Sequence, residues 1–405
     1  MANLGEMMAH VSRWVLPVSQ PPIQEGAVVV AQDRIQAVGP AKEILESFAG
    51  PVYDHGEGAI LPGLVNCHTH LEFSALAGRV PPQKRWEDWV EATLAGFALL
   101  TQEEMKKGID QGIQALRECG TILVGEVSNT AASWPHLETS PLAYHLFYEC
   151  LGFDLWDLRN LEEALPFFTL PAVANAPWVS AGAHAPYSVS PALFRAIRAW
   201  NAARRRPQTV HLSETQAEGD FLARGGGFFK DLLQRRGRTV EGFQPPGLSP
   251  AAYLAGLDFL GPSTLAVHGV WLEPSDCDLL ARTQTWLVIC PRANRYTGAG
   301  TPPLQELLQA GVPLALGTDS LAGNWDLNLF GDLLWLYEKF PEYSGDLWLR
   351  LGTLHGAQAL GRQDDFGSLE PGKKAALGYI PLPGAADFWG ELFTAGAAGE
   401  FCWIR

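Results

Sequence analysis

The feature that most restricts the fold of this chain is the alternation of short apolar, β-rich runs with helical stretches. One helical stretch is Ser190–Arg204, in which Ser190 can cap the first turn and Pro191 suits it. Alternation of this kind is typical of parallel βαβ units. The eight candidate strands are Ala59–Leu64, Thr121–Glu126, Ala143–Glu149, Val179–His184, Thr209–Leu212, Thr264–His268, Trp286–Cys290 and Val312–Gly317.

Eight strands joined by helices predict an α/β fold of the (β/α)8 TIM barrel type. The segment from His68 to Asp319 has about 250 residues, which is the usual size of such a barrel. Active sites in this fold lie at the carboxyl ends of the strands. Polar residues that end the candidate strands are therefore the first place to look for chemistry.

Both ends of the chain carry a further β pattern outside the barrel. Gly26–Pro40 is typical of a hairpin with its turn at Gln32 and Asp33, and a second β-like run lies at Lys374–Leu382. We expect the two ends to meet in one small β domain. The expected division is residues 1–57 and 359–405 for the small domain and 58–358 for the barrel.

Composition argues against several classes of protein. The net charge of −15 argues against nucleic-acid binding, because a phosphate backbone is bound by Lys and Arg. No apolar run approaches the roughly 20 residues of a membrane span, and the first residues lack the basic start of a secretory signal, so we expect a cytoplasmic protein. The six cysteines are scattered, which favours reduced, mostly buried thiols.

Two histidines one residue apart, His68 and His70, follow the first candidate strand in LPGLVNCHTHLEF. Residues i and i+2 of a strand point to the same face, so the two imidazoles would project together. That geometry suits two ligands of one metal ion. Taken alone, the pair fits two core histidines bonded to backbone carbonyls better.

Three later strands also end on residues that can bind metal. His211 ends TVHLSE, His268 ends TLAVHG and Asp319 ends PLALGTDS. Each alone has a simpler explanation as a core or capping residue. Because a barrel brings the carboxyl ends of all its strands to one face, these four strand ends, counting that of His68 and His70, together favour a metal site.

At this point the sequence resembles the amidohydrolase superfamily, within it the mononuclear deaminase and chlorohydrolase branch. The resemblance covers nearly the whole chain and rests on LPGLVNCHTHLEF, HAPYSVSP, HLSETQAE, AVHGVWL, CPRANRYTGAG, LALGTDS and GSLEPGKKAAL. It implies that the metal ligands are His68, His70, His211 and Asp319. It also implies that His268 orients the metal-bound water and that Glu214, of the HisXXGlu motif, shuttles protons.

These residue types fit hydrolytic deamination. Three imidazoles and a carboxylate can hold one Zn²⁺ or Fe²⁺, which lowers the pKa of a bound water toward neutrality and gives a hydroxide that attacks a C=N carbon. Glu214 can protonate the substrate nitrogen and the departing ammonia, and Asp319 can hold the hydroxide. Binuclear relatives bridge two metals with a lysine, yet this chain has none between Lys107 and Lys230, so we expect one ion.

Four residues are candidates for substrate binding. The resemblance implies that His184, in HAPYSVSP, contacts the substrate, although a structural histidine is the alternative. Arg292 and Arg295 lie in a loop that departs from the family pattern, and guanidinium groups pair with carboxylate or phosphate, so they suggest an anionic substrate. Glu72 could contact substrate or brace His70.

The resemblance extends to the aminodeoxyfutalosine deaminases of menaquinone synthesis, which share HTHLEFS and the compact length and act on a purine nucleoside bearing a benzoate. S-adenosylhomocysteine or methylthioadenosine deamination is the nearest alternative. Guanine or pterin deamination, triazine dechlorination and cyclic amide hydrolysis follow, and a scaffold barrel without activity is the least favoured.

The expected partner is a small molecule, and barrels of this kind often form homodimers. Trp86 and Trp89 could form a wall on which a base stacks, but a place in the core of an amphipathic helix is the favoured expectation.

Overall fold

A computed structural model describes residues 7–382, 384 and 387–404 of the chain. Its larger sheet has eight strands in the order β13-β12-β11-β10-β9-β8-β7-β6, and every paired neighbour is parallel. The barrel strands are β6 (Leu64–Thr69), β7 (Thr121–Ser128), β8 (Ala143–Cys150), β9 (Val179–Ala183), β10 (Gln208–Leu212), β11 (Thr264–His268), β12 (Trp286–Ile289) and β13 (Leu314–Leu316).

The two outer strands of this sheet meet, which makes it a nearly closed barrel. The backbone N–H of Asp319, just after β13, donates to the carbonyl of His68 in β6 at 3.0 Å. The carboxyl ends of all the strands consequently share one face. The predicted TIM barrel is confirmed, and seven of the expected strands lie within two residues of an observed one.

The first expected strand, Ala59–Leu64, is wrong. The apolar run is divided at Gly63 into β5 (Gly58–Pro62), which joins the small sheet, and β6, which opens the barrel. A continuous apolar run does not reveal where one strand ends and the next begins. The Pro62–Gly63 pair was the sequence signal of this break, because such pairs mark turns. The structure also requires a glycine there, since a side chain at Gly63 would lie 2.8 Å from Ile122 of β7.

The small sheet is built from both ends of the chain, as predicted. The hairpin turn at Gln32 and Asp33 joins its second and third strands. The division into 1–57, 58–358 and 359–405 remains a prediction, and the pairing of β5 favours moving its first boundary past Pro62. The strands are β1 (Met7–Val15), β2 (Ile23–Ala31), β3 (Arg34–Pro40), β4 (Val52–Asp54), β5, β14 (Leu377–Pro381) and β15 (Cys402–Trp403).

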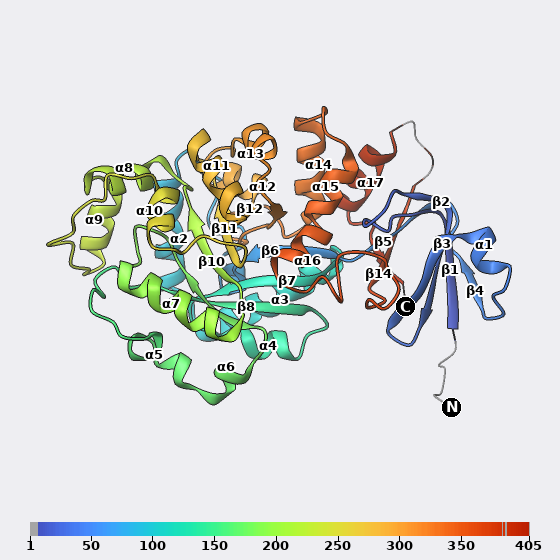
Figure 1. Cartoon of the computed structure of the whole chain (residues 1–405), viewed down its shortest axis with the longest axis horizontal. Coiled ribbons are helices and arrows are strands. Elements are labelled where there is room, and N and C mark those ends of the chain that lie inside the picture. The colour runs from blue at the N-terminus through green and yellow to red at the C-terminus, as the bar shows by residue number, and fades with distance from the viewer. Residues whose placement is uncertain (1–6, 383, 385–386, 405) are drawn as a thin grey trace.

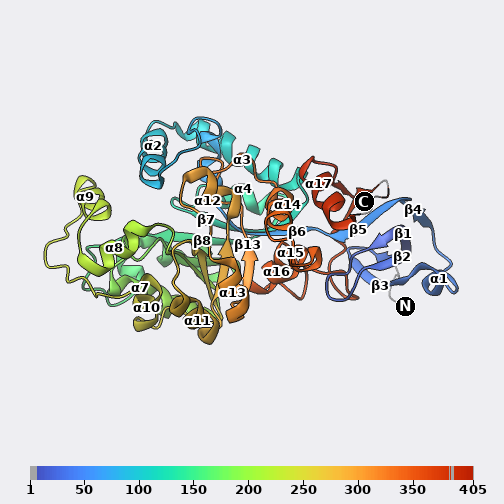
Figure 2. The same ribbon diagram turned by 90° about the horizontal axis from the view of Figure 1, so that it is seen from above.

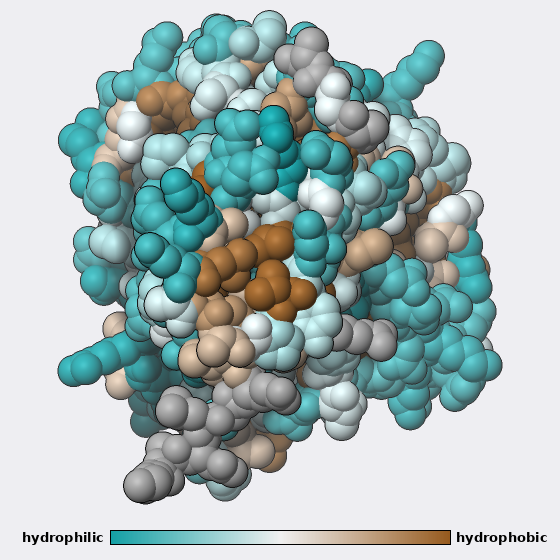
Figure 3. Space-filling view, turned by 90° about the vertical axis from the view of Figure 1, so that its right-hand side faces the viewer, coloured by the Kyte–Doolittle hydropathy of each residue, from teal (hydrophilic) through white to brown (hydrophobic). Residues whose placement is uncertain are grey.

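Helices cover the barrel, and the elements lie along one long axis. Figures 1 and 2 show the small sheet at one end of this axis and helices α8 and α9 at the opposite end. Seen from the small-sheet end, the surface is mostly hydrophilic, with a patch of apolar side chains near its middle (Figure 3).

The helices before β10 are α1 (Ala41–Leu45), η1 (Leu71–Leu76), α2 (Trp86–Ala98), α3 (Gln102–Glu118), α4 (Trp134–Glu138), α5 (Leu161–Ala164), η2 (Pro166–Thr169), α6 (Pro171–Asn175) and α7 (Pro191–Arg204). Those after it are α8 (Gln216–Arg224), α9 (Phe228–Arg235), α10 (Pro250–Gly256), α11 (Pro274–Thr283), α12 (Pro291–Thr297), α13 (Leu304–Ala310), α14 (Leu329–Lys339), α15 (Gly345–Leu351), α16 (Leu354–Ala359) and α17 (Phe388–Ala397).

Helix α7 shows how sequence fixes an element here. The Ser190 side chain accepts a hydrogen bond from the Leu193 N–H, Pro191 occupies the first turn, and Ile197 and Trp200 are buried against the barrel. Within the described part of the chain, no helix is both long and apolar enough to cross a bilayer. The cytoplasmic location and the homodimer remain predictions.

Candidate active site

The histidines and the aspartate predicted to bind metal meet at the carboxyl ends of β6, β10 and β13. One ring nitrogen from each of His68, His70 and His211 lies within 4.8 Å of the others. The Oδ1 atom of Asp319 lies 4.0 Å from Nε2 of His68 and 3.8 Å from Nε2 of His70. All four residues are buried. Residues separated by up to 251 positions in the sequence thus form one cluster.

Two residues at this site, one of them in the cluster, have an uncommon backbone conformation. His268 and Asp319 have φ values of 75° and 58°, in the left-handed region that side chains with a Cβ rarely adopt. Hydrogen bonds fix other members: Nδ1 of His211 donates to the carbonyl of His184 at 2.8 Å, which leaves Nε2 as its free acceptor. Strained backbone of this kind is concentrated at functional sites.

The chemistry of the cluster fits a divalent metal ion. Neither ring nitrogen of the buried His68 has a hydrogen-bond partner among the described residues. Burial, together with the neighbouring histidines, lowers the pKa of His68 well below its ordinary value, and burial lowers the pKa of His211 to about 3. Neutral imidazoles with free lone pairs are the form that binds metal, and an unsatisfied polar atom is costly to bury without a ligand.

Glu214 faces the cluster from just beyond β10. Its Oε1 atom lies 3.7 Å from Nε2 of His268 and accepts a hydrogen bond from Nε1 of Trp86 at 2.7 Å. Burial raises the pKa of Glu214 to about 8, although the Trp86 hydrogen bond opposes this shift. The Glu218 carboxylate accepts from the backbone N–H groups of Ser213 and Glu214, which holds the turn after β10.

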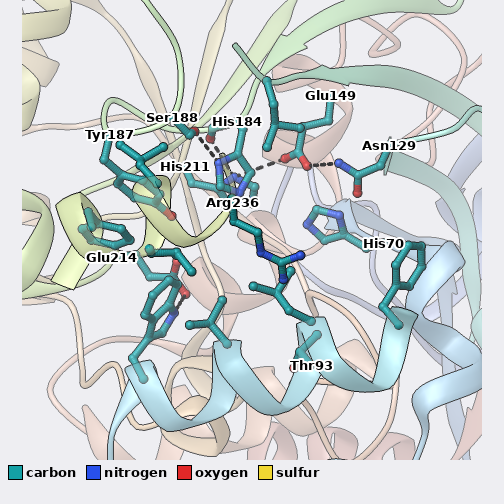
Figure 4. Close-up of a pocket in the computed structure, with 18 of the residues that line it drawn as sticks. His70, Thr93, Asn129, Glu149, His184, Tyr187, Ser188, His211, Glu214 and Arg236 are labelled. Atoms are coloured by element: carbon teal, nitrogen blue, oxygen red, sulfur yellow. Dashed lines mark hydrogen bonds and ion pairs between the residues drawn. The ribbon is translucent and has the colours of Figure 1, made fainter. Parts of the chain in front are cut away.

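A cavity of about 440 Å³ opens over the cluster. Helices α2 and α9 provide one apolar wall of the cavity, and Figure 4 shows Thr93 of α2 below the histidines and Glu214 at one side. Phe229 of α9 stacks on Tyr187 at 3.6 Å between ring centroids. Trp86 and Trp89 line this cavity, and they also belong to the packed interior, since Trp86 is buried in the hydrophobic core and Trp89 packs against it.

The opposite wall of the cavity is polar. His184 lines it, and its Nδ1 is held by the Ser188 hydroxyl at 2.6 Å, while its contact with substrate stays a prediction. Glu149 accepts a hydrogen bond from the Asn129 amide at 2.6 Å, and its other oxygen lies 3.4 Å from Nδ1 of His211. The wall therefore presents hydrogen-bonding groups to any molecule in the cavity (Figure 4).

The expectation that Arg292 and Arg295 lie at the rim of the substrate pocket is corrected by the structure. Neither residue lines the cavity. The Arg292 guanidinium makes two 2.7 Å hydrogen bonds to the carboxylate of Asp326. Arg295 is exposed on α12, with its guanidinium 5.9 Å from the ring centroid of Trp335. The segment expected to be a loop is a helix, and it turns both side chains toward α14 and its preceding loop.

Glu72 does not line the cavity either, so its interpretation as a substrate ligand is also corrected. Its buried carboxylate accepts hydrogen bonds from the hydroxyl groups of Ser128 and Thr130 and from the backbone N–H groups of residues 129, 130 and 132. Glu72 thereby fixes the loop that follows β7. This loop carries Asn129, which orients Glu149, so Glu72 positions one polar wall indirectly.

Replacing Glu72 with Ala should lower the free energy of unfolding by about 2–4 kcal/mol, because several buried donors lose their charged acceptor. Urea denaturation of both proteins measures this difference. Glu25→Ala is a matched control, since Glu25 is exposed and pairs with Arg13 at the surface, and it should change stability by no more than about 0.5 kcal/mol. Equal stability of the Glu72 variant and the wild type would contradict the loop-fixing role.

Sequence reasoning missed the residues that α9 and its following turn bring to the cavity. They include Phe229, Leu233, Arg236 and Arg238. Strand ends could not reveal them, because they lie on a helix inserted after β10. The basic run QRRGR, in an otherwise acidic chain and just before a Pro/Gly-rich linker, was a signal that could have found the two arginines.

Comparison with known proteins gives consistent matches across the chain. Residues 59–388 match the model of the Amidohydrolase family. A 5-methylthioadenosine/S-adenosylhomocysteine deaminase of Syntrophobacter fumaroxidans is 30% identical over 383 residues, covering 87% of this chain and 79% of that protein. The aminodeoxyfutalosine deaminase of Deinococcus radiodurans is 26% identical over 357 residues, covering 84% and 82%.

Solved structures share the fold. The Helicobacter pylori aminofutalosine deaminase in complex with methylthio-coformycin superposes with a TM-score of 0.81 at 20% identity, covering 98% of this chain and all of that one. An adenosine deaminase from Xanthomonas campestris with bound zinc gives a TM-score of 0.77 at 24% identity, covering 97% and 90%.

Proposed function

This chain belongs to the amidohydrolase family and is a hydrolytic deaminase, and from that premise we propose that it removes the amino group of an adenosine-type nucleoside as ammonia. The observation that carries the proposal is a single cavity in which the His68, His70, His211 and Asp319 cluster lies beside the buried acid Glu214. Relatives named as deaminases of methylthioadenosine, 5′-deoxyadenosine and aminodeoxyfutalosine support the adenosine-type substrate.

We assign one divalent metal ion to the four clustered residues, with Zn²⁺ the first choice and Fe²⁺ the alternative. The three imidazoles and the carboxylate are a ligand set that both ions accept. A structural relative with bound zinc supports the first choice. When bound, the ion would act as a Lewis acid that activates water for attack on the carbon bearing the amino group.

Glu214 is the proposed proton carrier. Because its pKa is raised to about 8, the carboxyl group holds a proton near neutral pH and can donate it to a ring nitrogen of the purine. The carboxylate that remains can then take a proton from the attacking water and deliver it to the departing amino nitrogen. The Trp86 hydrogen bond holds Oε1 in place for both transfers.

His268 and Asp319 are proposed to orient the attacking water. Nδ1 of His268 donates to the side-chain oxygen of Asn294 at 2.9 Å, so in the neutral ring Nε2 is the acceptor that faces Glu214. Burial raises the pKa of Asp319 to about 6, and its Oδ1 is held by the Ser320 N–H at 2.6 Å. These two residues can accept and hold the protons of a water placed between them.

The walls of the cavity suit the rest of a nucleoside. Aromatic side chains such as Trp86 and Phe229 offer flat surfaces to a purine, and Glu149 and His184 offer acceptors or donors to ribose hydroxyls. The finer proposal is an aminodeoxyfutalosine-like substrate with a carboxylate. Deamination of methylthioadenosine or S-adenosylhomocysteine is the second candidate, favoured by the identity of 30% to such an enzyme.

An ammonia-release screen tests the proposal. The screen includes adenosine-type nucleosides and guanine, cytosine and pterin compounds. Purified protein loaded with Zn²⁺ or Fe²⁺ should release ammonia from the adenosine-type nucleosides and from none of the others. Methylthioadenosine, which has no carboxylate, S-adenosylhomocysteine, whose carboxylate belongs to an amino acid, and a nucleoside with an aryl carboxylate separate the candidate substrates. Release from pterins or guanine alone would overturn the adenosine-type substrate, and consumption of cyclic amides without ammonia would overturn deamination.

A further inference from the structure

Arg236 is a cation that points into the cavity. It follows directly on α9 and lines the cavity, although it also reaches solvent. Figure 4 shows its side chain extending between the His184 and His211 side and helix α2, with the guanidinium near the middle of the cavity. No carboxylate of the described residues forms an ion pair with it.

Neighbouring arginines differ from Arg236 because each already has an acid. Arg235 bridges to Glu91 of α2 at 2.7 Å, and Arg238, which also lines the cavity, pairs with Asp154 at 3.3 Å. The Arg235–Glu91 pair also joins α9 to α2. Among the arginines and lysines described at the cavity, Arg236 is thus the one whose charge is left for a ligand.

The cavity wall formed by α2 and α9, where Arg236 enters the cavity, is apolar. On the α2 side it is lined by Val90 and Phe97, and on the α9 side by Leu232 and Leu233. A ligand group that crosses this region is favoured when it is apolar, since polar groups lose hydration there without gaining partners.

We propose that Arg236 binds a carboxylate at the end of an apolar substituent on the nucleoside and so selects for substrates of that class. The proposal rests on the proposed function, since it assumes that the base is deaminated at the metal cluster. A guanidinium matches the geometry of a carboxylate with two parallel hydrogen bonds, which a neutral substituent does not offer. The role expected of Arg292 and Arg295 thereby passes to a residue that follows α9.

The test compares two nucleosides that differ only in charge. One carries an aryl carboxylate on its 5′ substituent, and the other carries the corresponding neutral carboxamide. In Arg236→Gln, the ratio of kcat/KM for the carboxylate to that for the carboxamide should fall about 10- to 100-fold, mainly through KM for the carboxylate, because one charge-assisted pair is lost. Arg236→Lys should restore part of the ratio, since the charge returns without the planar fork.

Arg295→Gln is the matched control, because Arg295 is an exposed arginine outside the cavity, and it should leave the ratio as in the wild type. An unchanged ratio in Arg236→Gln, with both nucleosides still deaminated, would overturn the role of Arg236 and leave the deaminase assignment intact. Failure of the wild-type enzyme to release ammonia from either nucleoside would instead overturn the proposed function, and the inference with it.

Discussion

Replacement of His211 by Ala is expected to reduce bound metal from about one ion per chain to almost none and to abolish ammonia release. His211 joins His68 and His70 in one group of ligand atoms, and its Nδ1 bond to the His184 carbonyl aims Nε2 at that group. Loss of a partner that merely orients a ligand costs about 10- to 100-fold in metal affinity or activity, so loss of a ligand should cost more.

Metal analysis of the purified protein, before and after incubation with Zn²⁺ or Fe²⁺, measures the effect. Asp319→Ala should behave in the same way. His136→Ala is the control, because His136 pairs with Asp110 at the surface away from the cavity, and it should keep metal and activity. A His211 variant that still binds one ion per chain with wild-type turnover would show that the ligand set is assigned incorrectly.

The sequence predicted the barrel and the clustered histidines for the same physical reason. Parallel strands place their carboxyl ends on one face, so a polar residue that ends an apolar run can be assigned to that face from its place in the sequence. His211, His268 and Asp319 each end such a run, and the structure brings them together. The first strand failed because its apolar run continues through two strands of different sheets.

The substrate-binding residues could not be predicted in this way. Arg292 follows β12 in sequence, yet α12 turns its side chain to Asp326, and a local motif does not show which face of a short helix will be covered. Arg236 reaches the cavity from the end of α9, whose position depends on packing of Phe229 against Tyr187 and on the Arg235–Glu91 bridge. Such contacts join elements distant in sequence and have no periodicity that reveals them.

Replacement of Glu214 by Gln should leave the metal bound and lower kcat by about 100- to 10,000-fold, the usual contribution of a positioned proton donor. Gln has nearly the same shape, and its side-chain oxygen can still accept from Nε1 of Trp86, so the cavity should keep its form. What the amide cannot do is give up and regain a proton. The change should therefore lower kcat and leave the metal content unaltered, whereas His211→Ala should lose both activity and metal.

The pH dependence separates proton transfer by Glu214 from a packing effect. If the protonated carboxyl is the donor, the wild-type rate declines as pH rises through the pKa of Glu214, and the residual rate of the Gln variant lacks that decline. Glu241→Gln, at an exposed position in the linker, should retain the wild-type rate and profile. Full activity in Glu214→Gln would refute the assigned role, whereas a slow variant with an unchanged profile would assign the titrating group to another residue, such as Asp319. Both the pH dependence of the rate and its magnitude therefore test the role of the buried Glu214 carboxyl, which accepts a hydrogen bond from Trp86.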